Sequence, residues 1–352
     1  MCFENMPLFY RATPQNKNRR PYVHTRILGV SLTQLMVGLT LSAWALVLMC
    51  QGYAVVKKNY LDIKGKLLSI NQQETVYAYF IQDVLASGYR GCRTSDPHYP
   101  LYQPLLERHP VHRYHRFDKA LFAFHAKNSN CYGKLPDKIC DRVKEGTDVL
   151  VLYNVPRNQA VLSAGMQRPG EELKMQSKVK FNRDSLVLIS DCERAEVFLP
   201  DAVRQNLVAH PPLTKLYDKN TESAELEVIV YFVGLPERYL RRHPNKTNFS
   251  PYGLFRGNII HPVAEILPNI KEFKVNLRVF SPQSNQIYYI EAKRYQDEII
   301  LDVELSLTLG NNEVWTYEMA PRNRYGNVSG DDPARGILMS LPITFSRAIL
   351  GR

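Results

Sequence analysis

Three histidines at three-residue spacing, His109, His112 and His115, are the first residues of this chain whose types could do chemistry. Imidazoles at that spacing suit Zn²⁺ or Cu²⁺. However, Pro110 would interrupt a helix here, arginines surround the cluster, and no carboxylate lies inside it. The segment therefore predicts a basic, aromatic-rich surface loop and no metal site.

The same loop carries Tyr114 and Phe117 between its arginines. Aromatic and cationic side chains together can stack on and neutralise single-stranded nucleic acid. A solvated loop is the better interpretation, and nothing else in the sequence supports nucleic acid as a partner. The chain contains neither a G-x-S-x-G nucleophile elbow nor a phosphate-binding glycine loop. We expect no enzyme activity and no cofactor.

An apolar run without a charged residue occupies residues 30–50, directly after the basic segment Asn16–Arg26. A run of about 20 apolar residues is long enough to span a bilayer as a helix. The first 29 residues carry a net charge of +4 out of the +11 of the whole chain. Positive charge keeps that end in the cytoplasm, so the sequence predicts a single-pass inner-membrane protein with residues after Cys50 exported.

Residues 51–88 continue the helix with a different pattern. Apolar residues now fall three or four positions apart among lysines, glutamines and aspartates, as in an amphipathic helix with one buried face. Gly88 suits the left-handed conformation that ends many helices. Counted from Val30, the whole helix would be on the order of 80 Å long.

The remainder, residues 89–352, reads as a β-rich domain. Short apolar or β-branched runs bounded by turn residues predict strands at 149–153, 185–190, 225–234, 274–280, 287–291 and 299–309. No helical period separates them, so we expect an antiparallel sheet with the long helix packed against one face, an α+β fold. Residues 96–125 and the proline-rich breaks read as large loop insertions.

Four of the six cysteines, Cys92, Cys131, Cys140 and Cys192, fall on the exported side. An even number in an oxidising compartment suggests two disulfides, although four cysteines allow three pairings. Cys131 with Cys140 and Cys92 with Cys192 are the favoured pairs, the second tying the helix end to the sheet. Free buried thiols are the alternative.

Five sequence blocks carry a resemblance to a known family. They are LGVSLTQLMV at 28–37, ASGYRGC at 86–92, GTDVLVL at 146–152, SDCERAEVF at 190–198 and YGLFR at 252–256. Their types and order resemble PilW-type minor pilins of type IV pili. The resemblance covers scattered blocks from about Gly29 to about Arg256 and weakens towards the C-terminus.

The resemblance implies a prepilin and a type IV pilin-like fold. Residues 1–29 would be a cytoplasmic leader, cut between Gly29 and Val30. Residues 30–50 would form the transmembrane half of the N-terminal helix, and 51–88 its amphipathic half. Residues 89–352 would form the periplasmic or extracellular pilin domain.

Two positions depart from the family pattern. Family members usually have Phe or Met after the cut and Glu at the fifth mature position, whereas this chain has Val30 and Gln34. Glutamine can hydrogen-bond but carries no charge, so it cannot neutralise the amino-terminus of a neighbouring subunit. A subunit at the fibre tip, with no subunit beyond it, suits this change.

The function implied by the resemblance is non-catalytic. The protein would prime pilus assembly and form part of a tip complex, at first in the inner membrane and later at the pilus tip on the cell surface. Its partners would be other minor pilins, the major pilin, a tip adhesin and the prepilin peptidase that processes it. The alternatives are a type II secretion pseudopilin and a single-pass periplasmic scaffold of a transport or conjugation machine.

The first prediction is cleavage after Gly29. In a host with prepilin peptidase, intact-mass analysis of the membrane fraction should find a chain that begins at Val30. Gly29→Ala should slow processing, because the cut follows a small residue in this context. A full-length chain would contradict the prepilin interpretation and favour a permanent anchor.

Overall fold

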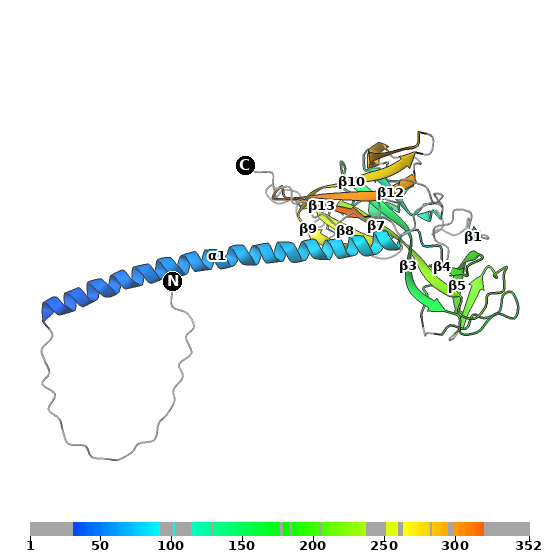
Figure 1. The fold of residues 1–352 in the computed structure, drawn as a ribbon, viewed down its shortest axis with the longest axis horizontal. Helices are drawn as coiled ribbons and strands as arrows, with labels where there is room; N and C mark the ends of the chain where they lie inside the picture. The colour runs from blue at the N-terminus through cyan, green and yellow to red at the C-terminus, as the bar shows by residue number, and fades with distance from the viewer. Residues whose placement is uncertain are drawn as a thin grey trace, which may run out of the picture. The chain divides into compact units, whose positions relative to one another are not determined.

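The computed structural model describes residues 31–91, 101–102, 114–117, 119–127, 130–176, 179–183, 185–203, 206–236, 251–259, 263–281, 284–294 and 299–319. The chain divides into two units, residues 1–67 and 68–352, and each is described by itself. The fold is α+β, with one long apolar helix near the N-terminus and largely antiparallel sheets (Figure 1).

Helix α1 runs from Leu32 to Ala86, 55 residues, inside the range predicted from the sequence. Ser87 closes its last turn, because the hydroxyl donates to the Val84 carbonyl oxygen over 2.7 Å. Gly88 follows with φ of 72°, a left-handed conformation that glycine adopts at little cost. The predicted helix end is confirmed.

The larger sheet has nine strands, and its main path follows the order β1-β5-β4-β7-β3-β2. Strand β6 pairs with β5, and β8 pairs with both β7 and β9. All pairings are antiparallel except β1 with β5. The strands are β1 (Leu101–Tyr102), β2 (Leu121–His125), β3 (Asp148–Val161), β4 (Leu186–Ser190), β5 (Ala195–Val203), β6 (Asn206–His210), β7 (Glu222–Gly234), β8 (Gly253–Asn258) and β9 (Ala264–Pro268).

A second, four-stranded sheet has the order β11-β10-β12-β13 and is antiparallel throughout (Figure 1). Its strands are β10 (Ile270–Ser281), β11 (Gln286–Glu291), β12 (Ile299–Leu309) and β13 (Val314–Met319). The sequence predicted a single sheet, because strand patterns do not show which strands pair. Two short helical segments, α2 (Asp137–Cys140) and η3 (Ala292–Arg294), complete the described elements.

The last turns of α1 pack against both sheets. Val76, Phe80 and Val84 are fully buried, at helical spacing, in one apolar cluster that includes residues of both sheets. The Phe80 ring lies 4.6 Å from that of Tyr231 in β7 and 5.7 Å from that of Tyr317 in β13. The predicted amphipathic packing is therefore present, but it is concentrated in these final turns.

Part of the predicted irregular loop is ordered core. Residues 121–125 form β2, paired with β3, and Leu121, Ala123 and Phe124 are buried although β2 lies at the edge of the sheet. His115 and Phe117 are buried and their rings stack at 5.7 Å. The surface-loop interpretation was wrong for these residues, because the basic residues around them hid a short apolar core segment.

Candidate functional site

The candidate functional site is the exposed part of α1, since apolar surface in water needs a partner. Every residue from Leu32 to Leu67 is exposed, and large apolar side chains recur along the whole segment. By its length and composition, α1 is the one helix among the described residues that could cross a membrane.

A heptad series of apolar residues runs along the exposed part of α1, although other exposed apolar residues, such as Trp44, Val55 and Leu61, lie off it. Positions alternate three and four residues apart from Leu32 to Leu67, and all but Ser42 in this series are apolar. We call the series the α1 seam: Leu32, Leu35, Leu39, Ser42, Leu46, Met49, Tyr53, Val56, Tyr60, Ile63 and Leu67. A 3.5-residue apolar period is the pattern of helices that wind around another helix.

The seam is longer than a bilayer requires. Its 36 residues would measure about 54 Å at 1.5 Å per residue, whereas the hydrocarbon core is about 30 Å thick. Beyond Cys50 the seam continues between charged neighbours, with Lys57, Lys64 and Lys66 directly beside it. The only acidic residue there, Asp62, lies off the seam. This part of α1 is an exposed apolar stripe with basic edges.

Gln34 has a local role that the sequence analysis missed. Its side-chain oxygen accepts a hydrogen bond from the Ser31 N–H over 3.3 Å, while the Gln34 N–H donates to the Ser31 carbonyl oxygen over 2.9 Å. This resembles a capping box, in which Ser is followed three residues later by Glu or Gln. Gln34 thus caps the start of the helix. Gly29 and Val30 lie outside the described residues.

A buried carboxylate anchors the other end of α1. The Asp83 side chain is 1% exposed and accepts three hydrogen bonds from two strands. Tyr231 in β7 donates its hydroxyl over 2.6 Å, and Arg256 in β8 donates Nε over 2.6 Å and Nη2 over 2.8 Å. Arg157 of β3 adds an ion-pair contact at 3.7 Å.

The anchor is electrostatically matched. Burial and the neighbouring Asp83 raise the pKa of Tyr231, so the phenol stays protonated and keeps donating. The bidentate Arg256 contact satisfies both oxygens of Asp83, as a buried carboxylate requires. A lone acid at helical spacing with Val76, Phe80 and Val84 was the signal in the sequence that could have revealed this site.

Two of the blocks that carried the family resemblance, ASGYRGC and SDCERAEVF, meet in space, and a third, YGLFR, contacts the same end of α1. Gly88 N–H donates to the Tyr153 carbonyl oxygen over 2.7 Å, and Tyr89 N–H to that of Asn154 over 3.0 Å. A Cβ on Gly91 would lie 1.9 Å from Ser190 Oγ, so only glycine fits beside the end of β4. The ASGYRGC block therefore packs against the start of SDCERAEVF, while Arg256 of YGLFR reaches Asp83.

The disulfides can be assigned in part. Cys131 and Cys140 form a disulfide of 2.06 Å, the pair favoured from the sequence. Cys192 is also disulfide-bonded. Cys92, its expected partner, lies outside the described residues, so that pairing stays a prediction. Cys50 is an exposed free thiol.

The histidine cluster is only partly covered. His109 and His112 lie outside the described residues, and His115 is buried in the core. No group of three metal-ligating side chains gathers within the described ranges. Comparisons of the chain with protein-family models, curated proteins and solved structures found no match.

The second prediction tests the anchor. Asp83→Asn keeps the shape but removes the charge that Arg256 and Tyr231 need, so unfolding free energy should fall by about 3 kcal/mol. Asp62→Asn, an exposed site on the same helix, should change it by no more than about 0.5 kcal/mol. Urea unfolding of the full-length protein in uncharged detergent measures both. Equal effects would contradict the anchoring role.

Proposed function

We propose that the protein is a minor pilin of a type IV pilus, with a type IV pilin-like fold, that primes assembly and forms part of the tip complex. The observation that carries this proposal is the α1 seam, which stays apolar and exposed well past the length of a membrane span. The sequence resemblance in five blocks supports the same class.

The α1 seam distinguishes a helix that takes part in assembly from a helix that only anchors the protein in a membrane. A membrane anchor needs apolar residues for about 20 positions and tolerates any arrangement beyond them. This chain keeps the heptad through Tyr53, Val56, Tyr60, Ile63 and Leu67, where lysines already occupy neighbouring positions. Exposed apolar side chains in that register are stabilised when another helix covers them.

Storage and assembly then use the same helix in two environments. While the subunit is stored in the inner membrane, lipid covers residues 30–50. During assembly, the helices of other minor pilins and the major pilin replace lipid along the seam and also cover its exported part. Because the seam edges are basic at Lys57, Lys64 and Lys66, the best-matched partner helix carries acidic residues beside its own apolar positions.

Two alternative functions would place different requirements on α1. A type II secretion pseudopilin would share the fold, the processing and the seam, and the ASGYRGC and SDCERAEVF blocks favour the PilW-type class over it. A permanently anchored scaffold of a transport or conjugation machine would need the apolar run but no seam beyond it. The seam therefore favours the assembly subunit over the scaffold.

The third prediction compares two adjacent leucines of equal exposure. Leu67 lies on the seam and Leu68 off it, and each is 55% exposed. Leu67→Ser should weaken helix association, since one buried leucine contributes about 2 kcal/mol, or roughly 30-fold in affinity. In a deletion strain, Leu67→Ser should restore fewer pili than Leu68→Ser, counted by electron microscopy at equal membrane levels.

A second matched pair of residues tests whether the result at position 67 depends only on its local surroundings. Ile63 on the seam is 58% exposed and Leu61 off it is 56% exposed. Ile63→Ser should impair piliation and cross-linking to other minor pilins more than Leu61→Ser does. If the variants on the seam and off it reduce piliation equally, the seam is not an assembly surface. That result would favour a permanent membrane anchor.

The fourth prediction places the subunit at the fibre tip. A shaft subunit must offer its fifth residue to the amino-terminus of a neighbour, and leaving that amine buried without a carboxylate would cost several kcal/mol. Immunogold labelling of wild-type pili should therefore be confined to fibre ends. Gln34→Glu should leave cleavage and assembly intact. Dense labelling along the shaft would contradict the tip position.

A further inference from the structure

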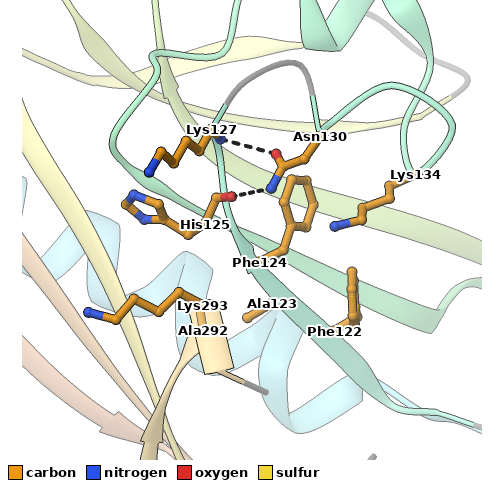
Figure 2. Close-up of a pocket in the computed structure, with 9 residues that line it drawn as sticks. All are labelled: Phe122, Ala123, Phe124, His125, Lys127, Asn130, Lys134, Ala292 and Lys293. Carbon is orange, nitrogen blue, oxygen red and sulfur yellow. Dashed lines mark hydrogen bonds between the residues drawn. The ribbon is translucent and has the colours of Figure 1, made fainter. Parts of the chain in front are cut away.

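A pocket of about 270 Å³ lies far from the exposed segment of α1 in the sequence. Its lining comes from β2, the loop after it and the 3-10 helix η3. Three lysines and one histidine line it, and no carboxylate does. In Figure 2 the nitrogen ends of His125, Lys127 and Lys293 lie on one side of the Phe124 ring and that of Lys134 on the other.

Lys134 is a cation held by aromatic rings. Its ammonium lies 4.5 Å from the centroid of the Phe124 ring and 5.7 Å from that of Phe122, both within cation–π range. Partial burial lowers the pKa of this lysine. The side chain as a whole is exposed, and among the described residues it has no carboxylate partner, so its charge is available to a ligand.

The loop around Lys134 is fixed. The Cys131–Cys140 disulfide closes it, and Lys134 N–H donates to the Cys131 carbonyl oxygen over 3.0 Å. Asn130 bridges the pocket rim, since its side chain donates to the His125 carbonyl oxygen over 2.7 Å and accepts from Lys127 N–H over 3.1 Å (Figure 2). The Lys134 side chain therefore projects from a loop that a disulfide closes and a backbone hydrogen bond stabilises.

His125 is oriented at the other end of the pocket. Its Nδ1 lies 2.7 Å from Asp148 Oδ1, and the second Asp148 oxygen accepts the Val275 N–H over 2.8 Å. Asp148 is buried, and this burial raises its pKa despite the two favourable contacts. With Nδ1 engaged by the carboxylate, the Nε2 atom of His125 is left as the group that can meet a ligand.

We propose that this pocket binds a carboxylated sugar of the uronic acid class, with the carboxylate against Lys134. Lys293 is ion-paired with Glu291 and His125 with Asp148, so Lys127 and Lys134 supply the positive charge that selects an anion. The partly exposed Phe122 ring suits the C–H face of a sugar ring, and His125, Lys127 and Asn130 can hydrogen-bond its hydroxyls. The volume lies just below the ~300 Å³ lower end of usual small-molecule pockets, which suits one ring.

The test uses the full-length protein in uncharged detergent and saturation-transfer NMR with methyl glucuronide, the probe for a sugar acid within a glycan. Methyl glucoside is the matched neutral sugar. The glucuronide should bind and the glucoside should bind at least about tenfold more weakly, because it lacks the charge-assisted contact. Free glucuronate is titrated in parallel. Binding of the free acid but not the glycoside would assign the site to a free sugar acid, within the same proposal.

Lys134→Met is the informative variant, because it keeps the apolar stem over the rings and removes only the charge. It should weaken glucuronide binding by at least about tenfold. Lys138→Met is the control: Lys138 is exposed within the same disulfide loop and does not line the pocket. It should leave binding unchanged. Thermal unfolding and an intact disulfide check the fold of both variants.

Three results would overturn the proposal. One is equal binding of glucuronide and glucoside, which would mean that charge plays no part. Another is an unchanged affinity in Lys134→Met, or a loss shared by Lys138→Met. The third is inorganic phosphate binding as tightly as the glucuronide, which would mean that the pocket recognises simple anions without a sugar ring.

Discussion

The carboxylate of Asp83 determines where the last turns of α1 lie on the sheets. A charge that is 1% exposed cannot be hydrated, so folding requires Tyr231 and Arg256 to reach it together. Those partners come from neighbouring strands of the larger sheet, and Arg157 approaches from a third. Buried ion pairs add little net stability, yet a broken one is costly. The anchor therefore acts mainly on position, because a shift of the helix along its axis would move Asp83 away from Tyr231 and Arg256 and leave the charge without its donors.

The final turns and the exposed segment of α1 are organised by different rules. Val76, Phe80 and Val84 are covered by the protein's own sheets and need no partner. The seam from Leu32 to Leu67 has no such cover within the described chain, and its 3.5-residue period is a pattern that only another helix matches well along its length. This division, with one apolar face covered and the other left exposed, supports the assembly role proposed above.

Local patterns were enough to predict much of the fold. The long helix, its end at Gly88 and the strands around residues 149–153, 225–234 and 299–309 follow from periodicity and turn residues. The division into two sheets was not predictable, since pairing depends on contacts between distant residues. For the site, Gln34 was recognised as unusual, but its capping bond to Ser31 and the Asp83 partners from distant strands were not. His115 was misread because surrounding arginines dominated the composition of a segment that folds inward.

The small disulfide loop links the state of the domain to its location. Lys134 lies between Cys131 and Cys140, so its position over Phe122 and Phe124 depends on a bond that forms in oxidising compartments. In the cytoplasm the same residues would be joined only by a turn, and the lysine would sample many rotamers before meeting the rings. If the domain is exported, as proposed, oxidation completes this surface after synthesis, whereas a chain kept in a reducing compartment would present a looser loop around Lys134.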